Sequence, residues 1–113
     1  MEKLNTTYEM ETADGGKVRL TLAYRYLYQL RAKHRDKYEG VNRVLSKGAK
    51  DIFDNIEVLY AAYLCQSIAD TGDTEGCMTF DEFLDVCPPF EQMAIAVGML
   101  IAPKKVMASA ALS

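Results

Sequence analysis

The sequence predicts an α+β fold that is mainly helical, with an N-terminal β-hairpin followed by about four to five helices. Three observations predict this class. Apolar and polar residues alternate near the N-terminus, apolar residues recur at helical spacing further along, and prolines and glycines separate these stretches. The chain has 113 residues, half of them apolar, which is enough for one core. We therefore expect one domain over residues 1–105 and a loose tail over residues 106–113.

The hairpin is expected in residues 1–22. Apolar and acidic residues alternate over residues 7–12, and apolar and polar residues alternate over residues 17–22. The Asp14-Gly15-Gly16 run between them favours a tight turn, because glycine adopts positive φ without steric cost. A two-stranded hairpin is marginal alone, so it has to pack on helices or join a partner's sheet.

Residues 23–48 are expected to form a basic helical segment. Apolar residues at steps of three and four favour one helix over residues 23–34, although the alternating tyrosines there leave an extension of the preceding strand open. The same spacing predicts a second helix over residues 36–45. Gly48 follows the second helix and can close its last turn.

Residues 50–102 are expected to form an acidic helical segment. The clearest helix of the sequence covers residues 50–69, where apolar residues make a broad face. Thr79 and Glu82 match a capping box at the start of a short helix. That helix stops at Cys87, because a proline disfavours helix in the residue before it.

The last helix is predicted from Phe90 to about Ala102, and Pro103 is expected to end it. It is nearly apolar all round and so has to be buried, either inside the domain or against another chain. The longest apolar run, Met93–Ala102, has ten residues, whereas a membrane-spanning helix needs roughly 17 or more. We therefore expect no membrane-spanning segment.

The charges are sorted along the chain. Residues 17–50 hold ten basic and two acidic residues, a net charge of +8, whereas residues 51–103 hold ten acidic and no basic residues, a net charge of −10. Basic and acidic helices can pair within the molecule, or head to tail with a neighbouring copy, and both arrangements favour protein contacts. Three tyrosines around Arg25 raise a second alternative, a small nucleic-acid-binding protein. Nucleic acid is the less favoured partner, because the acidic half would repel a phosphate backbone.

No catalytic constellation is recognisable in the sequence. His34, the single histidine, stands in a basic stretch without a nearby nucleophile or carboxylate pair. Cys65, Cys77 and Cys87 lack CxxC spacing, and no charged and then apolar leader precedes them. We therefore expect reduced thiols, a cytoplasmic location, no enzyme activity and no cofactor.

A further candidate site resembles an EF-hand calcium loop. With Gly76 at the sharp turn, the acidic residues Asp73, Glu75 and Glu82 fall on ligand positions three, five and twelve. The first position is Thr71 rather than aspartate, and the capping box explains Glu82 without a metal. Two interpretations of this segment therefore stay open. One is a degenerate EF-hand-like calcium-binding or regulatory domain, and the other is an acidic loop that binds no metal and precedes a capped helix.

Residues 50–105 resemble the tail assembly chaperones of long-tailed bacteriophages, of the siphophage or prophage type. The resemblance rests on the runs Phe53–Tyr63 and Met78–Asp85 and on a closing helix before Pro103-Lys104-Lys105. It implies a chaperone that binds and solubilises the tape-measure protein in the host cytoplasm, helps recruit tail-tube subunits and is absent from the mature virion. Such chaperones self-associate, so the resemblance also implies a homo-oligomer.

Large apolar side chains of the acidic segment are the candidate partner-binding residues. A chaperone for a helical client needs an apolar groove that accepts an amphipathic helix. Six residues could line such a groove: Phe53, Tyr60, Tyr63, Phe80, Phe83 and Met93. Each of them could equally belong to the core.

Overall fold

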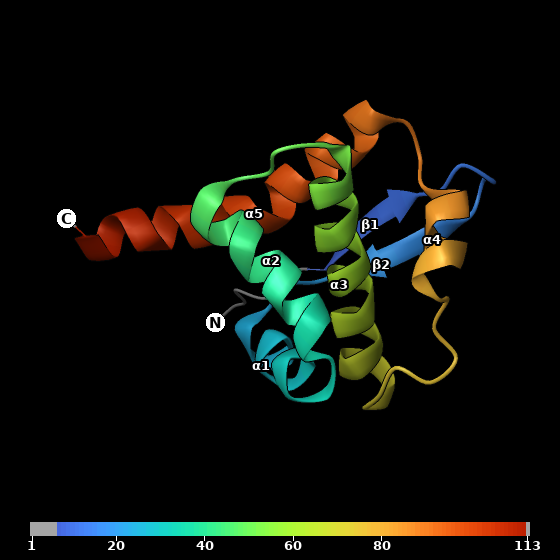
Figure 1. Ribbon diagram of the computed structural model, residues 1–113, viewed down its shortest axis with the longest axis horizontal. Coiled ribbons are helices and arrows are strands. Elements are labelled where there is room, and N and C mark those ends of the chain that lie inside the picture. Colours follow the sequence, from blue (N-terminus) through green and yellow to red (C-terminus); the bar gives the residue numbers. More distant parts are fainter. Residues whose placement is uncertain (1–6, 113) are drawn as a thin grey trace.

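The chain is mainly helical and begins with a two-stranded antiparallel hairpin, as the sequence predicts (Figure 1). The computed structural model describes the backbone of residues 7–112 and the side chains of residues 7–102. Its elements are β1 (Tyr8–Glu11), β2 (Lys17–Leu20), α1 (Tyr24–Lys33), α2 (Arg35–Lys47), α3 (Ile52–Thr71), α4 (Phe80–Val86) and α5 (Phe90–Leu112).

The hairpin is closed by the turn that its glycines predict. Gly15 has a φ of 91°, and the Gly16 N–H donates to Asp14 Oδ1 at 3.1 Å. Met10, Val18 and Leu20 are buried, whereas the residues that alternate with them are largely exposed. The hairpin therefore packs one face against the helices and leaves the other in solvent.

Two backbone hydrogen bonds attach the hairpin region to helices. The Ala13 N–H in the turn donates to the carbonyl oxygen of Val86, the last residue of α4, at 2.8 Å. The Thr21 N–H, just after β2, donates to the carbonyl oxygen of Ala62 in α3 at 3.2 Å. These contacts supply the support that a lone hairpin lacks.

Helix α3 is the centre of the fold. It packs against β2, α1, α2, α4 and α5, and Figure 1 shows it between α1 and α2 on one side and α4 on the other. Its N-cap residue Asp51 accepts a hydrogen bond from the Asp54 N–H at 3.1 Å. Its C-cap residue Gly72 has a φ of 93°, and the Gly72 N–H donates to the Ile68 carbonyl oxygen at 2.9 Å.

Ion pairs join part of the basic segment to the acidic one. Arg43 of α2 lies 3.0 Å from carboxylate oxygens of Asp54 and Glu57 in α3, and Arg19 of β2 lies 2.9 Å from Asp70. A hydrogen bond from the Lys50 N–H, together with Arg43, lowers the pKa of the Asp54 carboxyl. The sequence prediction that the two charge blocks can pair within the molecule is confirmed at these contacts.

Helix α5 is longer than the sequence analysis predicts. Its expected end near Ala102 is wrong, because the helix continues through Pro103 to Leu112. The residues after Pro103 are mostly alanine, lysine, methionine and leucine, whose helix propensity outweighs the hydrogen bond that one proline removes. The backbone of the expected loose tail is therefore helical up to Leu112. Ser113 and residues 1–6, where the hairpin was expected to begin, lie outside the described residues.

Candidate protein-binding surface

The six sequence-predicted partner-binding residues do not line one groove. Phe83 and Met93 are 0% and 2% exposed, and Tyr60 is 7% exposed, so these three belong to the core, the alternative that the sequence left open for each of the six. Tyr63 and Phe80 are half-buried. Phe53, in the first turn of α3, is 58% exposed and is the member of the six that a partner could reach fully.

An aromatic cluster explains this burial. The Tyr60 ring centroid lies 5.3 Å from those of Phe80 and Phe83, and the Tyr63 centroid lies 5.5 Å from that of Phe83. Rings at such separations attract each other beyond their simple area of burial. The Tyr60 hydroxyl donates to the Met78 carbonyl oxygen at 2.8 Å, and the Tyr63 hydroxyl accepts from the Met78 N–H at 2.9 Å. Burial raises the pKa of both tyrosines, and the cluster fixes α4 against α3.

The capping box at the start of α4 is confirmed. Thr79 Oγ1 accepts from the Glu82 N–H at 3.2 Å, and Glu82 Oε1 accepts from the Thr79 N–H at 2.9 Å. Asp73 Oδ1 accepts from the Glu75 N–H at 3.0 Å. Within residues 7–102, no three His, Cys, Asp or Glu side chains are grouped so that they could hold a metal ion. Asp73, Glu75 and Glu82 are therefore not brought together as calcium ligands.

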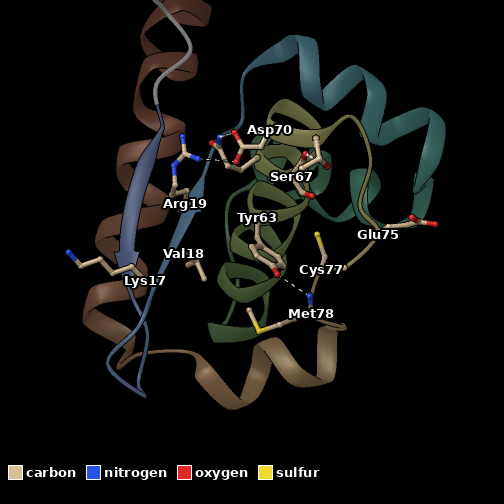
Figure 2. Close-up of a pocket in the computed structure, with 12 residues that line it drawn as sticks. Lys17, Val18, Arg19, Tyr63, Ser67, Asp70, Glu75, Cys77 and Met78 are labelled. Carbon is tan, nitrogen blue, oxygen red and sulfur yellow. Dashed lines mark hydrogen bonds and ion pairs between the residues drawn. The ribbon is translucent and has the colours of Figure 1, made fainter.

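A depression of about 470 Å³ lies between β2, α3 and the loop that precedes α4 (Figure 2). Arg19 reaches across it to Asp70, and the Tyr63 ring points toward Met78. The Ser67 hydroxyl, on its wall, donates to the Asp73 carbonyl oxygen at 2.8 Å. The Tyr63 and Ser67 hydrogen bonds hold the loop against α3, whereas the Arg19–Asp70 ion pair joins β2 to α3.

One face of α5 is apolar and exposed. Ile95 and Met99 are each 59% exposed, and Gly98 and Ala102 are exposed with them. Their spacing places the four residues in one row along the helix, which we call the α5 stripe. No charged residue occurs over residues 92–102, and a Cβ added to Gly98 would meet no atom within 4 Å.

The domain buries only one side of the last helix, so burial of the α5 stripe against another chain, one of the two alternatives of the sequence prediction, stays open. Helix α5 packs against α3 and β1, and a helix that contacts its neighbours along one side leaves the other side open. The sequence carried a signal for the stripe in the spacing of Ile95, Met99 and Ala102, but a helix without a polar face does not tell which side turns inward. In the described part of the chain, no single helix has the length and apolar character to cross a membrane; α4 and Phe90–Ala102 pass that test only together, bent by 118°.

A groove of about 260 Å³ lies between α1 and α2. Tyr28 is 66% exposed, and the Arg31 guanidinium lies 5.1 Å from the Tyr28 ring centroid and 5.9 Å from that of Tyr38. Tyrosine and arginine are the residues that most often dominate protein–protein contacts. We call this surface the α1–α2 groove; its lining residues are Tyr24, Leu27, Tyr28, Arg31, Tyr38, Asn42 and Leu45.

No protein-family model, curated protein or solved structure matches this chain. The function is therefore inferred from the surfaces themselves. The α5 stripe and the α1–α2 groove are two exposed surfaces whose chemistry suits contact with another polypeptide.

Proposed function

We propose that this protein is a phage or prophage tail assembly chaperone, which binds and solubilises a tape-measure protein and helps recruit tail-tube subunits. The observation that carries the proposal is the α5 stripe, an uncharged apolar row on a helix that packs against the core along its other side. A contiguous exposed apolar row of this kind suits contact with a partner. A long helical client offers an apolar row with the same spacing.

The stripe is suited to a helix in particular. Gly98 has open space above it, so the backbone of a client helix can approach closely between Ile95 and Met99. No charge has to lose water in this contact, because residues 92–102 carry none. Covering each of the two half-exposed side chains contributes on the order of 1–2 kcal/mol.

The client-binding surface then lies on α5 rather than on the aromatic cluster of α3 and α4. Tyr60, Tyr63, Phe80 and Phe83 hold α4 on α3 through their ring contacts. Phe53 remains a candidate contact, because it is exposed at the start of α3, the helix against which α5 packs.

The direct test is co-expression with a long helical tape-measure protein encoded in the same gene cluster. We expect the wild type to raise the soluble fraction of the client and to copurify with it. The variant I95E/M99E places two carboxylates on the stripe and should weaken client binding at least tenfold, because it removes more than about 1.4 kcal/mol of apolar contact. Binding is measured by calorimetry on the purified proteins.

The matched control is S46E/A49E, which adds two carboxylates at exposed positions near the end of α2. It should bind the client as the wild type does. Circular dichroism and the melting temperature check that I95E/M99E folds. A client that stays insoluble with the wild type, or that binds I95E/M99E as well as the wild type, contradicts the proposal.

A further inference from the structure

We propose that copies of this protein associate head to tail, with the basic surface of α1 in one copy docked on the acidic surface of α4 in the next. The α1–α2 groove supplies the apolar part of this contact. The proposal goes beyond client binding, because it concerns a contact between copies and holds whatever the client is.

The two helices carry opposite charges of equal size. Helix α1 has a net charge of +3 and no acidic residue, and α4 has a net charge of −3 and no basic residue. All six charged side chains are exposed. They are Arg25, Arg31 and Lys33 in α1 and Asp81, Glu82 and Asp85 in α4.

These charges lack the ion-pair partners that other charged residues of the described chain have. Arg43 and Arg19 have carboxylate partners in α3. Among residues 7–102, none of the six charged residues of α1 and α4 forms an ion pair with an oppositely charged residue. Figure 1 shows α1 and α4 at opposite sides of α3, so the two helices face away from each other. A second copy can bring them together.

Exposed aromatic side chains occur on α1 and at the start of the helix that follows α4. Tyr24 and Tyr28 are 58% and 66% exposed on α1, at the rim of the groove. Phe90, four residues beyond the end of α4, is 50% exposed and followed by another acid, Glu91. An aromatic side chain that enters a groove lined by tyrosines and an arginine is the usual centre of a stable contact. We therefore expect Phe90 of one copy to enter the α1–α2 groove of the next.

The contact joins two different surfaces, which determines the symmetry of the assembly. A head-to-tail contact generates a ring if its rotation closes and an open chain if it does not, whereas a closed dimer would need one self-complementary surface. The contact should also weaken with salt, because exposed charges are screened within about 10 Å at 0.1 M salt and about 3 Å at 1 M.

Charge reversal tests the proposal in sedimentation experiments. We expect the wild type to associate with rising concentration at about 20 mM salt and to dissociate at about 500 mM. The variants R25E/K33E and D81K/D85K should each be monomeric at low salt, because each places like charges on both surfaces of the contact. R25E/K33E carries −1 on α1 and −3 on α4, and D81K/D85K carries +3 and +1. A one-to-one mixture should associate again, because every contact between the two variants then joins opposite charges.

The control K47E/K50E makes the same change in net charge as R25E/K33E, but at the end of α2 and in the following loop. It should associate as the wild type does, and melting temperatures show whether each variant folds. A monomeric wild type at low salt, association of either reversed variant alone, or a mixture that stays monomeric would overturn the proposal. Association that ignores salt and disappears in I95E/M99E would assign the contact to the α5 stripe and overturn it too. The proposal is also overturned if the wild type does not self-associate but binds a short duplex DNA, and R25E/K33E does not bind that DNA.

Discussion

Helices α1 and α4 are both short, charged and packed on α3, yet their aromatic residues face opposite ways. Phe83 of α4 is fully buried among Tyr60 and Tyr63, whereas Tyr28 of α1 is largely exposed. Helix α1 turns a different apolar row inward, Leu27 and Leu30, and this leaves Tyr24 and Tyr28 exposed. In α4 the aromatic row is the one that faces the core. Aromatic spacing alone therefore does not mark a binding surface; it matters whether the helix has another apolar row to bury.

The strongest test of this comparison removes one aromatic ring from each helix. Phe83→Ala should lower the free energy of unfolding by about 3–5 kcal/mol, because it leaves a cavity in the core. Tyr28→Ala should change it by less than about 0.5 kcal/mol. Urea unfolding measures both. Similar losses in the two variants would mean that α1 and α4 do not differ as described.

Removal of the capping box tests how far the stability of α4 depends on these local hydrogen bonds. Thr79→Ala removes the side-chain acceptor for the Glu82 N–H and should lower the free energy of unfolding by about 0.5–2 kcal/mol. Ser46→Ala, at an exposed position within α2, is the control and should have almost no effect. If Thr79→Ala is as stable as the control, the ring contacts alone hold α4.

Removal of single tyrosine hydroxyls compares the buried Tyr60 with the exposed Tyr28. Tyr60→Phe keeps the ring but removes the hydrogen bond to the Met78 carbonyl oxygen, and should cost about 0.5–1.5 kcal/mol in urea unfolding. Tyr28→Phe, on the exposed face of α1, should cost almost nothing. Equal effects would show that the hydroxyl of Tyr60 is not engaged.

Alkaline pH should loosen the α4 side of the molecule. Burial raises the pKa of Tyr60 and Tyr63, so the folded state favours their neutral forms. The resulting stabilisation is complete below the ordinary tyrosine pKa of 10.0 and is lost as the pH rises through the raised value. The free energy of unfolding should fall above about pH 10, and the double variant Tyr60→Phe/Tyr63→Phe should show a shallower fall. An identical fall in the double variant would argue against this origin.

The smallest expected effect is that of calcium. Glu82 serves the capping box, and Glu82→Gln keeps a side-chain oxygen for the Thr79 N–H. We therefore expect micromolar calcium to leave the melting temperatures of the wild type and of Glu82→Gln unchanged. Stabilisation of the wild type by calcium, lost in Glu82→Gln, would instead support the EF-hand alternative.

Local signals predicted the elements well, because each depends on residues close in sequence. The Asp14-Gly15-Gly16 turn, the Thr79 capping box and the glycine after α2 all act as the sequence analysis expects. The end of α5 could not be predicted in the same way, because Pro103 is a local stop signal that the helix-forming residues after it override.

The candidate surface was harder to predict than the fold. Burial of Phe83 and Tyr60 depends on α4 folding back onto α3, a contact between residues about twenty positions apart in the chain. The exposure of Ile95 depends on which side of an almost entirely apolar helix meets α3 and β1. Charge sorting was visible from the sequence, but the packing decides that Arg43 has an ion-pair partner and that, among residues 7–102, Arg25 and Asp85 have none.

Because α3 lies at the centre of the fold, the basic and acidic halves of the chain are joined through packing against this one helix. Leu27, Leu30 and Val41 of the basic half belong to the same buried cluster as α3. A fragment that ended before α3 would leave these side chains bare, so the molecule should lose its structure in a single cooperative step. A cleavage in the loop between α2 and α3 should accordingly unfold both halves at once.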